Sequence, residues 1–529
     1  MEKISPLLAN KNFLYATEFF SGMSIMAVEL GAARLLAPYF SSSQIVWTII
    51  IGTIMIALAL GNVWGGRRAD LDANPAKLYR RLILAALWIG AIPVLGKFLI
   101  LVIAGVLIIA IDTDLLIWAA FLSCMAIFVL PLFLLGTVTP SLVKYATDNL
   151  EHNGRIVGNL NAFNTIGSII GTFLPTFLMI PTVGTAITFL IFSGILLSIG
   201  IIYFVSIGAR KIFCAGVVVI FIACALVGNS NSFAFWEKNL LCEDESIYNY
   251  LQVKDTPRQI IFSTNVLFGV QSLKVKDGNL TGMYYDYALA APLLAEGKKI
   301  LILGMGTGTF AEQCRKYFPA AQITGVEIDE KITALAKKYF ALPADVEVVT
   351  YDGRAFLQSD KNFYDVILVD AFQDISPPFQ MSSTEFFSLV RSHLAAGGVM
   401  VVNMNMRANG AGNINEYLID TIGKIFPALR TVDARGVTNR VLFAAAHEKV
   451  FSELRTRAEA LEDEKLSRLM IRIADEWQAP ECGENILTDD RAPVEILSMR
   501  ALDNIIQKNL QHYKEIYRRE GLDGVLNSF

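Results

Sequence analysis

The 529-residue chain is poor in the features that hold metal ions or follow nucleic acids. It has only four histidines, and its six cysteines show no CxxC or other zinc-like spacing. No run of lysine and arginine forms a basic stripe, and the formal net charge is only −4. We therefore expect no metal site and no nucleic-acid partner.

The pattern of a cleaved signal peptide is also missing. The first apolar segment is long and contains Glu18, Glu29 and Arg34, whereas a signal peptide has a short apolar core. Hydrophobic residues nevertheless make up 54% of the chain, and mean hydropathy is +0.47. Almost all of this excess lies before Gly228. The sequence thus predicts a helical membrane domain over residues 1–228 and a soluble half after it.

Apolar segments of about 20 residues predict about seven transmembrane helices. A segment in lipid must satisfy its backbone hydrogen bonds internally, as a helix does, and about 20 residues span the bilayer. The third segment is long and contains Pro93 and Gly96, so a kink or a hairpin is expected there. The segments lie at 13–38, 45–65, 80–110, 115–138, 158–181, 185–206 and 211–228.

Basic residues fall in alternate loops of this domain. The loops around 41–43, 112–114 and 181–184 carry none. The positive-inside rule therefore places the basic loops and the N-terminus in the cytoplasm, with the protein in the inner membrane. Seven crossings would put the soluble half outside, whereas six or eight would put it in the cytoplasm, so the side stays open. The basic loop residues are Arg67, Arg68, Lys77, Arg80, Arg81, Lys144, Arg155, Arg210 and Lys211.

Two acids and one base interrupt the first apolar segment. Glu18 and Glu29 are eleven residues apart, close to three helical turns, so they share a face. Ionisable groups at membrane depth usually pair or line a cavity. Either Glu29 pairs with Arg34 or another helix, or the acids face a polar cavity that admits a cation. Further on, Gly167 and Gly171 form a GxxxG pair that predicts close helix packing.

The soluble half changes its pattern along the chain. Residues 229–242 are interpreted as a linker, 243–290 as a small β subdomain and 291–529 as a Rossmann-like α/β domain. Strands alternating with helices predict a parallel sheet covered on both faces. The predicted strands are 248–253, 258–262 and 269–274 in the subdomain, then 299–303, 322–327, 346–350, 365–369 and 399–403. The predicted helices are 310–317, 330–340 and 384–394.

A glycine-rich loop follows the first strand of the α/β domain and opens a helix. Its glycines allow a ligand close to the backbone, and acids end the next strands, as in nucleoside-binding crevices. The loop contains Gly304, Gly306, Thr307 and Gly308, and the strand-end residues are Glu327, Asp352 with Gly353, and Asp370. Glycine spacing alone leaves a dinucleotide-binding dehydrogenase open, but Asp352 and Asp370 favour an adenosyl-sulfonium donor.

These motifs resemble the spermidine synthase (aminopropyltransferase) family from about residue 245 to 403. The similar stretches are "ESIYNYLQV", "ILILGMGTGT", "GVEID", "YDGRAF" and "YDVILVDAF". With its apolar first half, the chain looks most like bacterial membrane-fused spermidine synthase-like proteins. The resemblance implies a methyltransferase/spermidine synthase fold that transfers an aminopropyl group from decarboxylated S-adenosylmethionine to a polyamine such as putrescine. It also implies a homodimer, and no tightly bound cofactor.

The resemblance also assigns roles. Asp370 is expected to be the catalytic base, and Tyr284 to orient the amine. The donor-binding residues implied are Gln271, the glycine loop, Glu327 for the ribose, and Asp352 with Gly353 for the adenine. Tyr285, Asp286 and Asp374 are implied on the polyamine side. The acids of 488–495 could reach the acceptor side as well.

Two positions depart from the family pattern. Thr307 stands where the family has an aspartate that grips the amine of the donor, and Gln373 stands in place of a second loop acid. Two other functions therefore stay open. One is an S-adenosylmethionine-dependent methyltransferase. The other is a non-catalytic polyamine-binding or transport-coupled membrane protein that uses Glu18 and Glu29.

Overall fold

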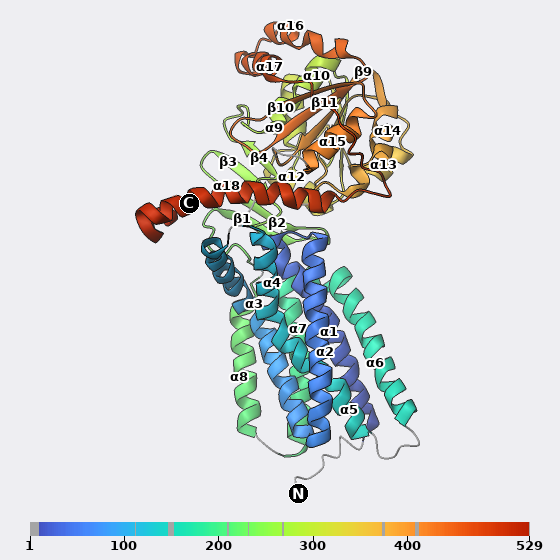
Figure 1. The fold of residues 1–529 in the computed structure, drawn as a ribbon, viewed down its shortest axis with the longest axis vertical. Coiled ribbons are helices and arrows are strands. Elements are labelled where there is room, and N and C mark those ends of the chain that lie inside the picture. Colours follow the sequence, from blue (N-terminus) through green and yellow to red (C-terminus); the bar gives the residue numbers. More distant parts are fainter. Residues whose placement is uncertain are drawn as a thin grey trace. The chain divides into compact units, whose positions relative to one another are not determined.

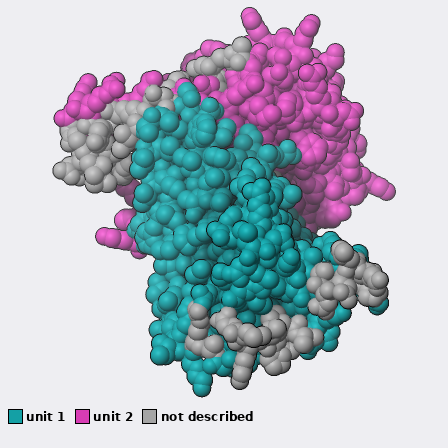
Figure 2. Space-filling view, turned by 60° about the horizontal axis from the view of Figure 1, so that its bottom comes forward, with its two compact units in different colours: residues 1–237, 243–250, 265–267 teal, residues 238–242, 251–264, 268–529 magenta. Residues whose placement is uncertain are grey.

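The structure is a computed structural model of the whole chain. It describes residues 10–111, 113–146, 153–208, 211–230, 232–266, 269–372, 376–407 and 412–527. The chain forms two compact units (Figure 2). Unit 1 comprises residues 1–237, 243–250 and 265–267, and unit 2 comprises 238–242, 251–264 and 268–529.

Unit 1 is a bundle of long apolar helices that run side by side (Figure 1). Asparagine side chains cap two of them: Asn10 accepts from the backbone N–H of Asn12, and Asn74 from that of Ala76. The helices are α1 (Lys11–Phe40), α2 (Gln44–Leu71), α3 (Pro75–Ala110), α4 (Leu115–Gly136), α5 (Val138–Ala146), α6 (Asn153–Leu174), the π-helical η2 (Pro175–Met179), α7 (Ile180–Ser206) and α8 (Lys211–Gly228).

Six helical stretches of the described chain are long and apolar enough to cross a membrane. The fifth, Asn153–Ser206, has 54 residues, about 81 Å at about 1.5 Å per residue, against a hydrocarbon core of about 30 Å. Its backbone leaves the helix at Gly184, where φ is 84° and ψ is 169°. This stretch therefore contains the two segments predicted at 158–181 and 185–206.

Two sequence features of unit 1 have clear outcomes. The third apolar segment is one helix, α3, that continues through Pro93, so the hairpin alternative is wrong. The predicted close packing at Gly167 and Gly171 is confirmed: a Cβ at these positions would lie 2.0 Å from the carbonyl oxygen of Phe19 and 2.1 Å from that of Met23 on α1. Only glycine lets α1 and α6 approach so closely.

Two sheets follow the helices in the chain. The small antiparallel sheet has the order β1-β2-β3-β4, and its first strand begins inside the segment interpreted as a linker. The large sheet has the order β10-β11-β9-β8-β5-β6-β7. The strands are β1 (Leu240–Glu245), β2 (Tyr250–Asp255), β3 (Gln259–Ser263), β4 (Ser272–Val275), β5 (Lys299–Leu303), β6 (Gln322–Glu327), β7 (Glu347–Thr350), β8 (Tyr364–Val369), β9 (Leu394–Met404), β10 (Ala428–Asp433) and β11 (Arg440–Ala445).

The large sheet is mixed, whereas the sequence predicted a parallel one. Strands β5 to β9 are parallel, but β11 runs antiparallel to both β9 and β10. The β10–β11 hairpin closes within a short turn that contains Gly436 at φ +79°. A parallel pair needs a long crossover, whereas a hairpin needs only such a turn.

Helices of unit 2 cover both faces of the large sheet (Figure 1). One face contributes alternate residues such as Ile300, Leu368 and Val401 to a core with α10, α16 and α17. The helices are α9 (Tyr284–Ala288), α10 (Ala290–Ala295), α11 (Thr309–Tyr317), α12 (Glu330–Tyr339), α13 (Gly353–Ser359), η3 (Phe379–Met381), α14 (Thr384–Ser392), α15 (Ile414–Gly423), η4 (Glu448–Glu453), α16 (Leu454–Glu459), α17 (Glu464–Glu476) and α18 (Val494–Asn527).

Candidate functional site

The order of the large sheet reverses next to β5. From β5 the chain moves outward to β6 and β7, and then returns to β8 on the other side of β5. Ligands of such sheets bind beyond the carboxyl ends of the strands at this switch point. The predicted site residues Gly304, Glu327 and Asp370 all lie at these ends, and they are brought together here.

The glycine loop is shaped by its neighbours. Gly304 has φ +82°, and a Cβ there would lie 2.6 Å from the carbonyl oxygen of Asp370. Gly306 has φ +57° and faces the hydroxyl of Ser272. Its N–H donates to Glu327 Oε2 at 2.8 Å. Because both glycines adopt left-handed backbone conformations beside packed atoms, side chains are excluded at these two positions, which lets a ligand approach the backbone closely.

Glu327 is a buried acid with a fixed orientation. Its Oε2 accepts from Gly306, and its Oε1 accepts from the N–H of Asp329 at 3.0 Å. Only 7% of Glu327 is exposed, and this burial raises its pKa to about 7. Each carboxylate oxygen can accept a second hydrogen bond, so both retain capacity for hydroxyl donors such as those of a ribose.

Asp352 and Gly353 lie where β7 gives way to α13. Asp352 Oδ1 accepts from the N–H of Ala355 at 2.8 Å, so this side chain caps the helix. The cap leaves Oδ2 without a hydrogen bond in the described residues. A Cβ on Gly353 would contact Met381 of η3. Asp352 therefore has a structural role beside the donor role that the resemblance implies.

Asp370 lies directly after β8, and two neighbours donate to it. Tyr284 Oη donates to Oδ2 at 2.5 Å, and Asn403 Nδ2 donates to Oδ1 at 2.9 Å. The surrounding protein, and to a lesser degree the charge of Glu327, raises its pKa to about 7, although both hydrogen bonds act in the opposite direction. Asp370 as a whole residue is partly exposed. The result is an oriented carboxylate that can exchange a proton near neutral pH.

Two adjacent tyrosines stand beside this carboxylate. Tyr284 and Tyr285 are both buried, and their ring centroids are 4.0 Å apart. The Tyr285 hydroxyl donates to the backbone carbonyl of Gln271, so Gln271 contacts the site through its main chain. Burial and the charge of Asp370 raise the pKa of Tyr284, which keeps its hydroxyl protonated as a donor.

The remaining predicted residues are arranged differently. Asp286 is buried and accepts from the N–H and hydroxyl of Thr281 and from the N–H of Gly282, so its carboxylate faces its own loop. Thr307 is 1% exposed, and its hydroxyl has no hydrogen-bond partner among the described residues. Asp374, with Gln373, lies outside the described residues.

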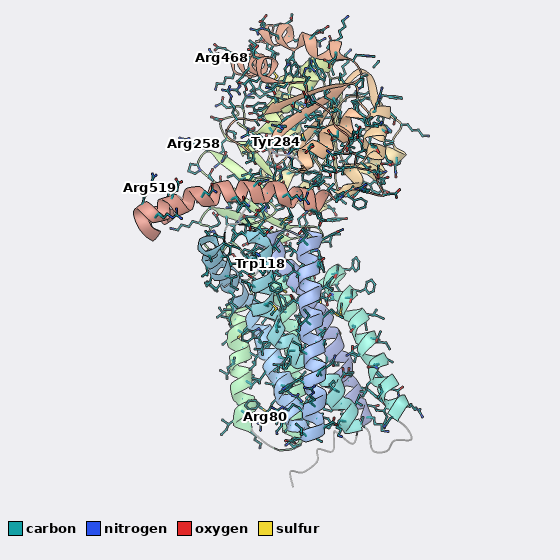
Figure 3. The ribbon with its side chains drawn as sticks, in the orientation of Figure 1. Arg80, Trp118, Arg258, Tyr284, Arg468 and Arg519 are labelled. Atoms are coloured by element: carbon teal, nitrogen blue, oxygen red, sulfur yellow. The ribbon has the colours of Figure 1, made fainter. Side chains whose placement is uncertain are left out.

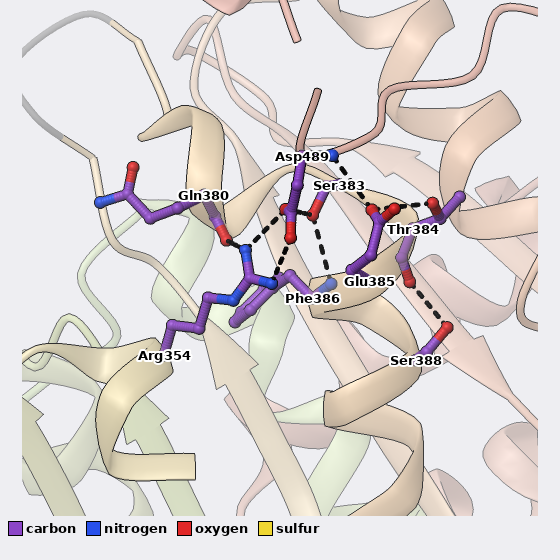
Figure 4. Close-up of polar contacts among 8 residues, drawn as sticks. All are labelled: Arg354, Gln380, Ser383, Thr384, Glu385, Phe386, Ser388 and Asp489. Atoms are coloured by element: carbon purple, nitrogen blue, oxygen red, sulfur yellow. Dashed lines mark hydrogen bonds and ion pairs between the residues drawn. The ribbon is translucent and has the colours of Figure 1, made fainter. Parts of the chain in front are cut away.

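The sequence reasoning missed an ion pair next to the predicted adenine residues. Arg354 Nη1 and Nη2 donate to the two oxygens of Asp489 at 2.7 and 2.6 Å (Figure 4). Ser383, the cap of α14, also donates to Asp489 at 2.6 Å. Asp489 belongs to the 488–495 stretch expected near the acceptor, and here it ties α13 to α14. The acidic "TDD" run was visible in the sequence, but nothing in the sequence identified Arg354 as its partner.

Comparisons with known proteins identify relatives of this chain. Residues 287–430 match the spermine/spermidine synthase domain. A probable polyamine aminopropyl transferase of Bifidobacterium longum is 51% identical over 346 residues, covering 62% of this chain and 78% of the relative. A polyamine aminopropyltransferase of Buchnera aphidicola is 26% identical over 210 residues, covering 35% of this chain and 73% of that relative. The structure of a probable spermidine synthase from Corynebacterium glutamicum superposes with a TM-score of 0.36 at 20% identity, covering 46% of this chain and 96% of that chain.

The family match and the sequence relatives define a transferase. The chain belongs to the spermidine synthase (polyamine aminopropyltransferase) family. The resemblance found in the sequence is therefore confirmed.

Proposed function

We propose that the protein transfers an aminopropyl group from decarboxylated S-adenosylmethionine to a polyamine such as putrescine, with Asp370 as the base. The observation that supports this most directly is the Asp370 carboxylate, which has a donor on each oxygen, a partly exposed surface and a pKa of about 7. A general base works best when its pKa lies near the working pH.

The chemistry follows from the charges involved. The amine lone pair attacks the methylene carbon bonded to the sulfonium, the new C–N bond forms, and the C–S bond breaks. Its electron pair returns to sulfur, which leaves neutral methylthioadenosine. The nitrogen loses one proton, and Asp370 accepts it. Proton acceptance by a positioned side chain is typically worth about 10²–10⁴-fold in rate.

The donor would lie over the glycine loop. Glu327 would accept the ribose hydroxyls, and the Asp352–Gly353 turn would face the adenine. Tyr284 would hold Asp370 in place while the amine approaches, and Tyr285 would support Tyr284 by ring contact. Holding the amine and the sulfonium in line supplies much of the remaining acceleration.

The direct test is product formation. Purified protein is incubated with decarboxylated S-adenosylmethionine and a panel of di- and triamines, and methylthioadenosine is measured by mass spectrometry. We expect product with at least one amine. If intact S-adenosylmethionine were consumed instead, with transfer of a methyl group, the protein would be a methyltransferase and Thr307 would explain the changed donor.

We further propose that the helices of unit 1 cross a lipid bilayer. Near one end of the bundle, Thr17 faces Tyr79, and Lys144 pairs with Asp70 at 3.1 Å. Near the other end, the N–H of Val266 donates to the carbonyl of Pro38 at 2.8 Å. Thr17 and Pro38 on α1 are separated by about 31 Å at about 1.5 Å per residue, the thickness of a hydrocarbon core.

The two ends differ in charge, and this supports a side for the soluble half. Arg80 and Trp118 lie at opposite ends of unit 1 (Figure 3). Basic loop residues gather at the Arg80 end. At the other end, Glu245 accepts from the N–H and hydroxyl of Thr185, just before the chain continues into unit 2. The positive-inside rule alone then favours the side of the membrane opposite the basic loops for the catalytic unit, whereas a cytoplasmic adenosyl donor favours the cytoplasm.

Cysteine labelling in intact cells tests this side. In a Cys482→Ser background, which removes an exposed native thiol, we compare Arg468→Cys on α17 with Lys77→Cys in the first turn of α3, at the basic end of unit 1. A membrane-impermeant maleimide should label only Arg468→Cys before lysis. The reverse pattern would place the catalytic unit in the cytoplasm. The cytoplasmic outcome is the one that the proposed chemistry favours, because adenosyl donors are cytoplasmic compounds.

A further inference from the structure

The Asp370 carboxylate is held by a chain of buried amides that the sequence did not reveal. On parallel strands, Val369 of β8 is paired with Val402 of β9, so Asp370 and Asn403 emerge side by side. Asn403 Nδ2 donates to Asp370 Oδ1 at 2.9 Å. Asn439, just before β11, donates through Nδ2 to Asn403 Oδ1, also at 2.9 Å.

The direction of these hydrogen bonds matters. An asparagine amide can rotate by half a turn and exchange its oxygen and nitrogen. If Asn403 did so, its oxygen would face the Asp370 carboxylate. Because Asn439 presents an N–H₂ group to Asn403, it favours the orientation in which Asn403 donates to Asp370. Asn439 is in turn within 3.5 Å of Asn405 Oδ1, a second acceptor for the same amide.

Burial makes the arrangement consequential. Asn403 is 3% exposed and Asn439 is 5% exposed, so water cannot replace either hydrogen bond freely. A buried amide left without a partner is costly, and a donor to a carboxylate is worth more than a donor to a neutral group. Neither asparagine is needed for the sheet itself, because any residue can supply the backbone hydrogen bonds of β9 and β11.

Resting on the function proposed above, we propose that Asn439 and Asn403 are positioning residues for proton acceptance: Asn439 fixes the orientation of the Asn403 amide, and Asn403 holds Asp370 Oδ1 as an ionised acceptor. Asn439 contacts neither the carboxylate nor the reacting atoms. It acts through Asn403. Among the described residues, the other titratable groups that interact with Asp370 are Tyr284, Tyr285 and Glu327.

The proposal predicts how the protonation of Asp370 responds to substitution. Asn403→Ala removes a donor that favours the ionised form, so the midpoint of Asp370 protonation should rise by about one pH unit, a tenfold change in the equilibrium. Asn439→Ala should move the midpoint in the same direction by a smaller amount. The double variant should match Asn403→Ala alone, because residues that act in series are not additive.

The midpoint can be measured without turnover. Infrared difference titration follows the carboxyl stretch of Asp370, which is assigned by subtracting the spectrum of Asp370→Asn. The control is Asn413→Ala, another buried asparagine of unit 2, whose side-chain oxygen accepts from the backbone N–H groups of Asn415 and Glu416 at the start of α15. It should leave the midpoint unchanged even if it lowers the melting temperature. An unchanged midpoint in Asn439→Ala would overturn the proposal, as would full additivity in the double variant.

Kinetics separates this proposal from the proposed function. If the wild-type protein makes methylthioadenosine, Asn439→Ala should lower kcat by a few-fold at pH 7 and shift the acidic limb of kcat/KM to higher pH, with donor affinity unchanged. If the wild-type protein forms no product with any amine, the aminopropyl reaction fails. The infrared midpoints then still decide whether the two asparagines control Asp370.

Discussion

Each unit of the molecule holds a carboxylate by hydrogen bonds from neighbouring side chains, and the two residues differ in hydrogen-bond pattern and in exposure. Asp370 in unit 2 has a donor on each oxygen and retains exposed surface. Glu18 in unit 1 has no exposed surface. Thr139 and Asn164 both donate to its Oε1, at 2.6 and 2.8 Å, and Oε2 has no partner among the described residues.

The difference teaches that burial alone does not mark a reacting acid. A base must be reached by the group whose proton it takes, so some access is required as well as orientation. Asp370 has both, whereas Glu18 has orientation without access and joins α1 to α5 and α6. The described residues show no ion pair between Glu29 and Arg34, which instead donates to the carbonyl of Ile247. The cation-path alternative therefore gains no support from Glu18.

The largest expected effect is on methylthioadenosine formation, and it should distinguish Asp370 from Glu18. Asp370→Asn keeps the shape of the side chain but removes the proton acceptor, so methylthioadenosine formation should fall by about 10²–10⁴-fold. Donor affinity measured by calorimetry should change little. Glu18→Gln is the matched change in unit 1 and should leave the turnover number intact. Equal losses in both variants would mean that the two carboxylates serve one reaction, contrary to our assignment.

A second comparison concerns glycines that touch a neighbouring backbone in each unit. Gly304→Ala places a methyl group against the Asp370 carbonyl at a position with φ +82°, which strains the backbone by about 1–2 kcal/mol and displaces the donor loop. Donor affinity should fall by at least about tenfold. Gly171→Ala in unit 1 separates α1 from α6 and should lower the melting temperature instead. Loss of donor binding in Gly171→Ala would contradict this division of roles.

The pH dependence of the reaction sharpens the role of Asp370. Its pKa is raised to about 7, so the proton acceptor is the minor species below that pH and dominant above it. We expect kcat/KM to rise about tenfold per pH unit on the acidic side and to level off above about pH 7. A profile that is flat from pH 5 to 8 would exclude Asp370 as the base. Because Glu327 also has a pKa near 7, donor binding must be titrated separately.

The sequence was most informative about features that a short stretch of residues defines by itself. The bounds of β5 and β6 were predicted as the structure has them, since β5 is an apolar run that stops before a glycine and β6 ends at an acid. The strand ends then located Glu327 and Asp370 without any tertiary information. The glycine loop was recognisable for the same reason, because its spacing is local.

Relations across the chain were not recoverable in this way. Asn403 ended the last predicted strand, but its role depends on Asn439, which lies 36 residues further on and in a hairpin that was not predicted. Asp286 matched a motif, yet its loop folds back and occupies both carboxylate oxygens. Such outcomes depend on which side chains meet in space, and a single sequence specifies that only through the complete fold.

The smallest expected effect concerns the ion pair between Arg354 and Asp489, which links two helices of unit 2 without touching the proposed base. Asp489→Asn removes one charge but can still accept from Ser383, and because both partners are partly exposed the loss of stability should be at most about 1 kcal/mol. Hydrogen bonds from Arg354 lower the pKa of Asp489 below its ordinary 3.8, so this stabilisation is present above about pH 4 and is lost as the pH falls further. Thermal unfolding at pH 7 should therefore separate the wild-type protein from Asp489→Asn by a few degrees, and the difference should shrink as the pH falls below about 4. A difference that did not change with pH would show that Asp489 stabilises α13 and α14 through packing instead of charge.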